Sequence, residues 1–247
     1  MKILATYNIK GGVGKTSTAV NLAYLAARDG ARPLLWDLDP QAAATYVFRI
    51  RPRVKGGGKR VIRGSRPLED AIKGTDFANL DLLPADFSYR HMDLMLDAAR
   101  KPTRQLGRVL EPLAEDYDVV VLDCPPSMSL VSENVLRACD TVLVPLIPTT
   151  LSVRTLDQLT EFVADSGGHK PTMLGFFSMV DRRKKLHREI MATLSAQRTD
   201  LAATAIPALS VIEQMALHRA PVPVFAPHSV ATRCYESLAA EALPVST

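Results

Sequence analysis

The amino-acid sequence predicts an α/β fold: a doubly wound, mostly parallel β-sheet with helices on both faces. Three observations lead to this prediction. Short apolar runs alternate with segments of helical periodicity along nearly the whole chain. The clearest run, DVVVLD at 118–123, is apolar on both faces, as a strand inside a parallel sheet is. The 247 residues are 47% hydrophobic and 23% charged, which is typical of a globular domain, here expected over 1–247.

The N-terminal part begins with an apolar run at 2–7 that ends at a glycine cluster, and we expect it to be the first strand. A helix is expected over 15–28, because apolar residues recur on one of its faces and Gly30 suits the position after its end. Apolar runs at 33–37 and 80–83 predict the second and third strands.

The remainder of the chain continues the same alternation. Strands are expected at 118–123, 141–146 and 173–179, and helices at 104–115, 130–138, 153–164, 185–196 and 230–242. Strict alternation of strands and helices indicates crossover connections between parallel strands. The segment 49–66, rich in Gly and Arg, lacks apolar periodicity. We expect it to be a loop within the domain, or an element that a partner orders.

The positive charge is concentrated in two runs. Residues 49–66 hold eight Lys or Arg and no acid, and 182–188 hold five more, again without an acid. Outside these runs 17 basic residues stand against 26 acidic ones, although the net charge of the chain is +4. Basic segments on an acidic body indicate either a polyanion-binding face or solvated surface loops.

Several features favour a cytoplasmic protein. The three cysteines are an odd number without CxxC spacing, which is typical of free thiols in a reducing compartment. The longest uncharged apolar stretch, 141–153, has 13 residues and two prolines, too few to span a bilayer. Lys10 and the glycine cluster come before any signal-peptide core.

A glycine-rich motif, KGGVGKTS at 10–17, lies between the first predicted strand and the first predicted helix. Glycines allow backbone N–H groups to surround phosphate oxygens, and the N-terminus of a helix adds partial positive charge. Lys15 can reach the β- and γ-phosphates, and the hydroxyl of Thr16 can bind Mg²⁺. The motif therefore predicts an ATP and Mg²⁺ site with contributions from Gly11, Gly12, Val13, Gly14, Lys15, Thr16 and Ser17.

Carboxylates end two of the predicted strands. Asp123 ends the most apolar strand and precedes a Pro-Pro turn, the position at which P-loop enzymes hold Mg²⁺, commonly through water. Asp37 and Asp39 end the second strand and, two residues apart, are expected to point the same way. One of them can orient the attacking water.

Three motifs together resemble the ParA/MinD superfamily. KGGVGKT resembles its deviant Walker A box, DLDPQ at 37–41 the first switch of ParA proteins, and DYDVVVLDCPPS at 116–127 their Walker B strand and second switch. The resemblance extends over nearly the whole chain, and Ile206-Pro207 resembles the segment on the adenine side.

The resemblance implies a role for each matching residue. Lys10 matches the signature lysine, which reaches the partner's nucleotide in an ATP-sandwich homodimer. Lys15 and Thr16 match the P-loop lysine and the Mg²⁺ ligand, Asp39 the carboxylate that positions water, and Asp123 the Walker B aspartate. Lys10, Lys15 and Asp39 are therefore the expected catalytic residues, Thr16 and Asp123 the metal ligands, and Pro207 a further nucleotide contact.

Nine residues precede the motif, so the chain resembles the small ParA proteins, which bind non-specific DNA through the surface of their dimer. The resemblance makes Arg182, Arg183 and Lys184 candidate DNA contacts. The arginines that the family places after its Ile-Pro pair are absent here, where Ala208-Leu209-Ser210-Val211 follow. Arg219 and the 49–66 run are candidates for the missing charge.

The expected function is that of a weak, partner-stimulated ATPase that segregates or positions a cargo on the nucleoid. A ParB-like or cargo-adaptor protein would stimulate hydrolysis, and no membrane is expected as a partner. Three alternatives stay open. A MinD-like membrane ATPase needs a basic amphipathic terminal helix, which 231–242 does not resemble. An iron–sulfur protein needs more cysteine ligands than Cys124 supplies. A metabolic ligase or synthetase on this fold needs a substrate pocket that no sequence pattern reveals.

Overall fold

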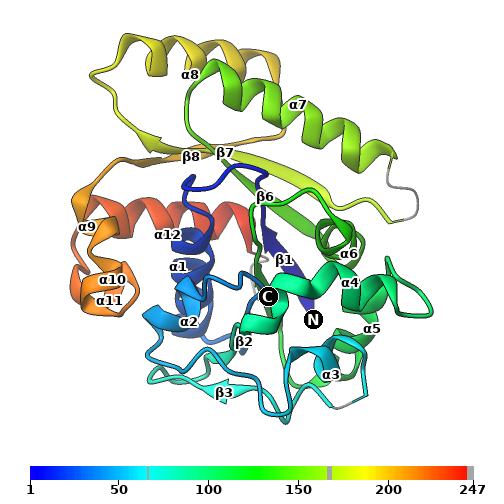
Figure 1. Cartoon of the computed structure of the whole chain (residues 1–247). Coiled ribbons are helices and arrows are strands. Elements are labelled where there is room, and N and C mark those ends of the chain that lie inside the picture. Colours follow the sequence, from blue (N-terminus) through cyan, green and yellow to red (C-terminus); the bar gives the residue numbers. More distant parts are fainter. Residues whose placement is uncertain (66, 166–168, 244–247) are drawn as a thin grey trace.

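The computed structural model describes residues 1–65, 67–165 and 169–243, and within them the strands form a single sheet. The strand order is β3-β4-β2-β5-β1-β6-β7-β8 (Figure 1). All neighbours are parallel except the short β3, which is antiparallel to β4. The strands are β1 (Lys2–Thr6), β2 (Pro33–Asp37), β3 (Lys73–Gly74), β4 (Asp81–Leu83), β5 (Val119–Asp123), β6 (Thr141–Leu146), β7 (Thr172–Val180) and β8 (Leu201–Pro207). The predicted fold class is confirmed.

Helices cover both faces of this sheet, as predicted (Figure 1). They are α1 (Lys15–Arg28), α2 (Ala43–Val47), α3 (Gly58–Ile62), α4 (Met92–Asp97), α5 (Gln105–Leu110), α6 (Leu130–Ala138), α7 (Thr150–Asp165), α8 (Lys185–Gln197), α9 (Ser210–Glu213), α10 (Met215–His218), α11 (Val222–Phe225) and α12 (Val230–Ala242), with short 3₁₀ helices η1 (Phe87–His91) and η2 (Glu111–Glu115). The predicted helix over 104–115 is divided into α5 and η2, with Pro112 at the start of η2.

The alternation of side chains along β5 creates two hydrophobic cores, one on each face of the sheet. Val120 and Leu122 belong to the core under α3 to α7, whereas Val119 and Val121 belong to the core under α1, α2 and α12. Successive residues of a strand point to opposite faces, so a central strand needs apolar residues on both. This explains the uninterrupted apolar run that identified β5 in the sequence.

The register of the central strands brings their carboxyl ends together. Thr6 of β1 and Asp37 of β2 both pair with Asp123 of β5. β1 lies between β5 and β6, and the glycine motif follows it. Loops at the carboxyl edge of an open α/β sheet form the usual ligand crevice.

Several short elements, among them α2, β3, α4 and α9 to α11, were not predicted, and two further differences have a clear physical reason. The segment 49–66, expected to be a loop, contains α3, and Val54, Val61 and Ile62 are buried in the core below it. Three apolar side chains are enough to pack the segment, although they are too few and too irregularly spaced to show helical periodicity. Strand β8 was not predicted, because its alanines and threonine show little of the β-branched pattern that marks a strand.

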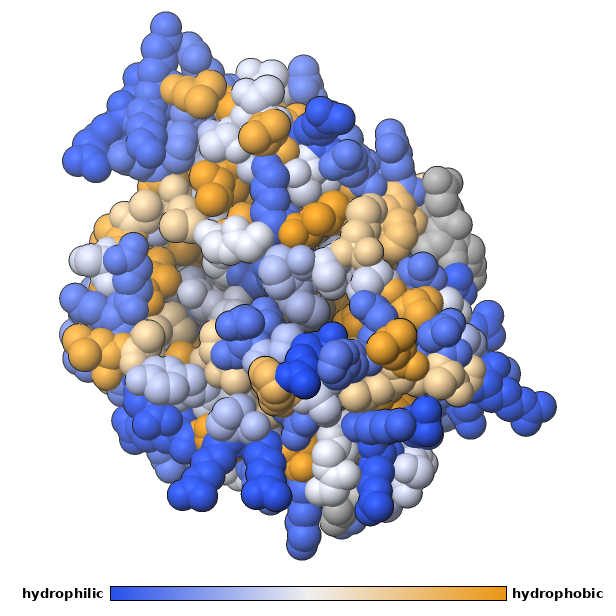
Figure 2. Space-filling view, viewed as in Figure 1, coloured by the Kyte–Doolittle hydropathy of each residue, from blue (hydrophilic) through white to orange (hydrophobic). Residues whose placement is uncertain are grey.

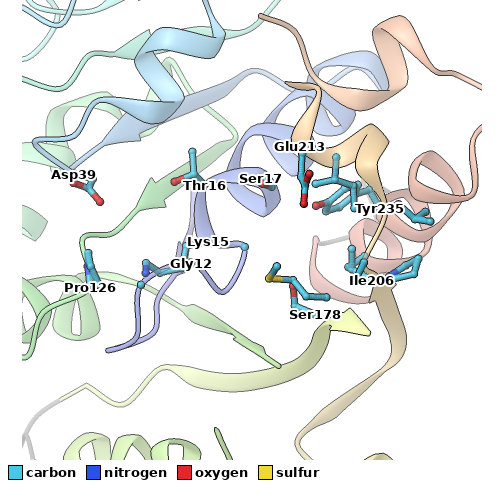
Figure 3. Close-up of a pocket in the computed structure, with 17 residues that line it drawn as sticks. Gly12, Lys15, Thr16, Ser17, Asp39, Pro126, Ser178, Ile206, Glu213 and Tyr235 are labelled. Atoms are coloured by element: carbon cyan, nitrogen blue, oxygen red, sulfur yellow. The ribbon is translucent and has the colours of Figure 1, made fainter. Parts of the chain in front are cut away.

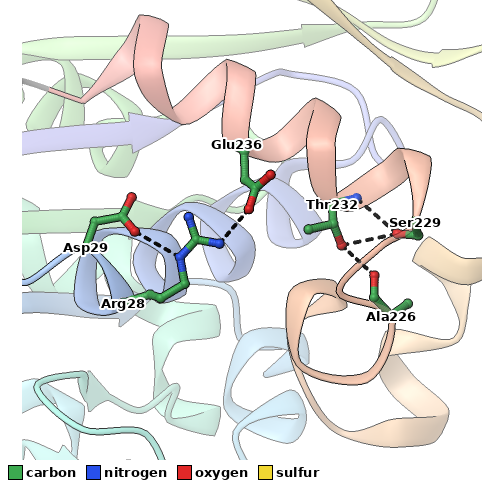
Figure 4. A network of polar contacts seen from close by, with 6 residues as sticks. All are labelled: Arg28, Asp29, Ala226, Ser229, Thr232 and Glu236. Atoms are coloured by element: carbon green, nitrogen blue, oxygen red, sulfur yellow. Dashed lines mark hydrogen bonds and ion pairs between the residues drawn. The ribbon is translucent and has the colours of Figure 1, made fainter.

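The last helix, α12, packs onto α1 and β8, as expected of a terminal helix whose apolar face is buried. Arg28 of α1 forms ion pairs with Asp29 and with Glu236 of α12, while Ser229 caps the helix by accepting from the backbone N–H of Thr232 (Figure 4). No helix within the described residues is long and apolar enough to cross a lipid bilayer.

Candidate functional site

The glycine motif forms a tight loop that leads into α1. Gly12 and Gly14 adopt positive φ angles of +67° and +96°, and Gly14 is the residue that caps the helix. A Cβ atom on Gly14 would lie 2.8 Å from the Oγ atom of Ser178 on β7. Both the backbone conformation and the close approach of β7 therefore require glycine at this position. The free N–H groups at the start of α1 form an anion-binding end.

This loop forms one wall of a cleft of about 320 Å³, which Figure 3 shows from close by. Among the predicted site residues, the cleft is lined by Gly11, Gly12, Gly14, Lys15, Thr16, Ser17, Asp39 and Pro207. The structure thus brings the P-loop, the segment after β2 and the end of β8 into one cavity. Val13 is the exception in the loop, since its side chain is buried in the core.

Lys15 is 6% exposed, and its ammonium group donates to the backbone carbonyl of Lys10 at 2.9 Å. Burial lowers the pKa of Lys15, while the nearby carboxylate of Asp123 acts in the opposite direction. The side chain therefore lies inside the curve of the loop, where a phosphate would lie.

Asp123 is completely buried, and neither of its carboxylate oxygens has a hydrogen-bond partner among the described residues. Burial first, and then the neighbouring Asp37, raise the pKa of Asp123 well above its usual range, whereas Thr16 and Lys15 lower it. An unpartnered carboxylate in the interior is costly unless a cation or donor compensates it. Two free carboxylate oxygens near the Thr16 hydroxyl are the hard oxygen donors that Mg²⁺ prefers, so these residues fit that ion.

The two aspartates at the end of β2 have different environments, although they were expected to point the same way. The carboxylate of Asp37 is fully buried and accepts hydrogen bonds from the backbone N–H and hydroxyl of Thr45 and from the backbone N–H of Asp39. Burial raises the pKa of Asp37 to about 6. Asp39 is half-buried and lines the cleft. Asp37 thus holds the loop in place, and Asp39 is the carboxylate that faces the cavity.

Lys10 lies at the edge of this arrangement. Its backbone N–H donates to the side chain of Asn8 at 2.9 Å, its carbonyl accepts from Lys15, and the residue is half-exposed. It is not among the residues that line the cleft. The Lys10 side chain is therefore available on the surface beside the cleft rather than inside it.

The lining of the cleft also contains residues that sequence reasoning missed. Ser178 and Met179 come from β7, Glu213 from α9 and Tyr235 from α12 (Figure 3). Met179 has a positive φ of +53° at an irregularity in the pairing of β7 with β8, which turns the end of β7 toward the cleft. No local pattern marks these residues, because only the packing of three distant segments brings them to one wall.

The predicted DNA contacts lie outside the cleft, on the loop between β7 and α8. Arg182, Arg183 and Lys184 are exposed, and hydrophilic side chains form the protrusion at the upper left of Figure 2 over this loop. Arg183 donates through Nε and a terminal nitrogen to the carboxylate of Asp181 at 3.0 Å, which lowers the pKa of Asp181 to about 2. Within the described residues no ion-pair partner faces Arg182 or Lys184.

Arg219 lies elsewhere, at the end of α10. Its Nε donates to the backbone carbonyl of Tyr46 at 3.0 Å, and its guanidinium group lies 4.5 Å from the centre of the Tyr46 ring. Arg219 therefore links α10 to α2, and its predicted contact with DNA stays a prediction.

Comparisons with known proteins found similar sequences and similar structures. The sequence matches the AAA domain family AAA_31 over residues 1–170. It is 32% identical over 246 residues to the sporulation initiation inhibitor protein Soj of Bacillus subtilis, and the match covers 97% of both chains. Its structure is similar to cobyrinic acid a,c-diamide synthase from Mycobacterium smegmatis with an ATP analogue and magnesium, with a TM-score of 0.83, 28% identity and coverage of 97% and 93%.

The fold is also that of an McdA variant from Cyanothece in complex with ATP, with a TM-score of 0.86 at 22% identity and coverage of 100% of this chain and 98% of that one. Cell division ATPase MinD from Pyrococcus furiosus has the same fold, with a TM-score of 0.78, 22% identity and coverage of 97% of both chains. The family match and the full-length likeness to Soj identify the group. The chain belongs to the Soj/ParA family, within the ParA/MinD superfamily of P-loop ATPases.

Proposed function

We propose that this protein is an ATPase that dimerises with ATP, binds DNA without sequence preference, and segregates or positions a cargo. One observation supports the ATPase activity most directly: a single cleft joins a glycine loop, a helix N-terminus, the buried Lys15 and the half-buried Asp39, and the buried Asp123 lies close to Lys15 and Thr16 without being part of the cleft lining. Those groups are the ones that nucleotide phosphates, a divalent cation and a water nucleophile require.

The site residues have complementary roles in the proposed hydrolysis. The N–H groups of the loop and the ammonium of Lys15 hold the phosphates, and Pro207 contacts the base side. Thr16 and Asp123 hold Mg²⁺, directly or through water, and the bound ion supplies charge neutralisation at the phosphates. Asp39 orients the attacking water, because its carboxylate faces the cavity while that of Asp37 is bound to Thr45.

The proposed homodimer accounts for two features at the carboxyl edge of the sheet. Lys10 lies outside its own cleft, where it can reach the nucleotide of a partner subunit. Met128 and Leu151, which follow β5 and β6, are 49% and 65% exposed. Exposed apolar side chains beside a charged cleft indicate an interface, because a second subunit that covers them removes apolar surface from water.

DNA binding is proposed for the loop between β7 and α8, because Arg182 and Lys184 project there without an ion-pair partner among the described residues. Contacts of Arg and Lys with phosphates are independent of sequence and weaken with salt. A ParB-like or cargo-adaptor protein is the proposed activator of hydrolysis, and the cargo stays undefined.

The test measures dimerisation and DNA affinity of the purified protein with Mg²⁺–ATP, with Mg²⁺–ADP and without nucleotide. We expect a dimer and DNA binding with ATP only, with affinity independent of sequence and falling steeply with salt. The Arg182→Ala/Arg183→Ala variant should lower the salt slope by about one to two, nearer to one because Asp181 already pairs with Arg183.

A matched variant distinguishes the rival basic run. Lys59→Gln/Arg60→Gln removes two exposed charges from α3 and leaves the buried Val61 and Ile62 intact. If this variant loses DNA binding while Arg182→Ala/Arg183→Ala binds normally, DNA binds at α3, and its assignment to the loop between β7 and α8 is wrong. Absence of DNA binding to the wild-type protein with ATP at low salt refutes the proposal as a whole.

Two alternatives make different predictions in the same experiments. A MinD-like protein would bind anionic vesicles with ATP, but the apolar face of α12 is already buried against α1 and β8. A metabolic synthetase is the second candidate function, favoured by the 28% identity to the M. smegmatis cobyrinic acid a,c-diamide synthase. Such an enzyme would need neither DNA nor ATP-dependent dimerisation, so failure of both in the test above favours it.

A further inference from the structure

A second cavity, of about 400 Å³, lies between α5 and α6, and none of its lining residues is shared with the nucleotide cleft. Its charged and polar lining among the described residues consists of Arg104, Arg108, Arg137, Glu111, Asn134 and His169. Three arginines and one glutamate give this cavity a formal charge of +2 while His169 is neutral. We propose that it binds a phosphate-bearing ligand.

The arginines are placed to act together. Arg104 is the N-cap residue of α5 and Arg108 lies in its last turn, four residues later, where its backbone N–H donates to the carbonyl of Arg104; both side chains are exposed. Neither arginine forms an ion pair with Glu111 or with any other described residue. Arg137, half-buried on α6, completes the set from the facing helix.

The chemistry of the lining favours phosphate over a generic anion. All the lining cations are arginines, whose planar guanidinium groups bind two oxygens of a phosphate at once, whereas lysine offers a point charge. His169 adds a further group: its Nε2 lies 3.1 Å from the carbonyl oxygen of Cys139, so Nε2 carries a hydrogen and donates.

Hydrogen bonds hold together the two helices that carry these side chains. Asn134 of α6 is fully buried, and its side chain accepts from the backbone N–H groups of Gln105 and Leu106 and donates to the carbonyl of Pro102. These hydrogen bonds fix the start of α5 against α6, and the two helices are in contact. The backbone of the site therefore needs no rearrangement, and binding orders only the exposed arginine side chains.

The closing experiment follows the imidazole signals of the full-length protein by NMR, with Mg²⁺–ADP present to occupy the nucleotide cleft. The chain has five histidines, so His169→Gln identifies the His169 signal. Tripolyphosphate and a short DNA duplex are titrated separately, with sodium chloride at equal ionic strength as the control. We expect a saturable shift of the His169 signal with tripolyphosphate, with the duplex, or with both; the pattern tells whether a free or a backbone phosphate is the ligand.

The Arg104→Gln/Arg108→Gln variant should weaken this binding by about tenfold or more, because it removes two charge-assisted contacts. The matched control, Lys73→Gln/Arg154→Gln, removes two exposed charges elsewhere and should bind as the wild type does. No saturable shift with either probe, or equal affinity in the two double variants, overturns the proposal. Nucleotide binding and dimerisation are measured separately, so failure here leaves the proposed ATPase function unaffected.

Discussion

Gly14 and Gly30 lie at the two ends of α1 and have nearly the same positive φ, +96° and +98°. Their surroundings differ. A Cβ on Gly14 would lie 2.8 Å from the Oγ of Ser178, whereas a Cβ on Gly30 would meet no atom within 4 Å. Gly30→Ala is therefore a control for Gly14→Ala that shares the conformational strain and lacks the contact.

The expected loss of stability is the sum of two costs, the backbone strain of alanine and the contact with Ser178. A left-handed conformation costs an alanine about 1–2 kcal/mol at either position. At Gly14 the Ser178 hydroxyl must also leave its rotamer, which costs about 0.5–1.5 kcal/mol. Gly14→Ala should therefore destabilise the protein by about 1.5–3.5 kcal/mol and Gly30→Ala by about 1–2 kcal/mol. For a chain of this length, the difference corresponds to a melting temperature lower by about 1–6 °C.

Urea denaturation of Gly14→Ala, Gly30→Ala and Ser178→Ala measures the cost of the backbone strain and the cost of the Ser178 contact separately. Gly14→Ala made in the Ser178→Ala background should cost as much as Gly30→Ala, because the contact is gone. Nucleotide affinity should fall in Gly14→Ala and stay unchanged in Gly30→Ala, which lies about 20 Å away along α1. Equal destabilisation by Gly14→Ala and Gly30→Ala, or unchanged nucleotide binding by Gly14→Ala, would refute this reasoning.

Three further predictions concern the proposed ATPase site. Asp39→Ala should keep nucleotide binding and dimerisation but lower turnover about a hundredfold, measured as phosphate release; a wild-type rate would remove Asp39 from its role. Lys10→Ala should leave nucleotide binding by the monomer intact but impair the ATP-dependent dimer in size-exclusion chromatography, and a normal dimer with normal turnover would contradict a cross-subunit role. Asp123→Asn should abolish Mg²⁺-dependent turnover and, in EDTA at neutral pH, raise the free energy of unfolding by about 1–3 kcal/mol, because burial and the neighbouring Asp37 disfavour the carboxylate that asparagine replaces; lower stability in EDTA would contradict the environment described for Asp123.

Much of the fold and the phosphate side of the cleft could be predicted from the sequence, because both depend on short-range patterns. A strand buried on both faces must be apolar throughout, which identified β5, and the run of glycines before Lys15 can bind phosphate only between a strand and a helix. The same local logic placed Asp37, Asp39 and Asp123 at one edge of the sheet, since the ends of parallel strands meet there, whereas the choice of Asp39 over Asp37 came from the family resemblance.

Tertiary packing alone decided the remainder. Asp37 and Asp39 are equivalent in sequence, and only the position of Thr45 on α2 made one structural and left the other facing the cleft. The run at 49–66 contains α3 because the sheet offers its few apolar residues a core in which to pack. The wall of Ser178, Glu213 and Tyr235 joins β7, α9 and α12, which are distant along the chain. Contacts of this kind depend on where whole elements settle, and no local pattern of residue types encodes that.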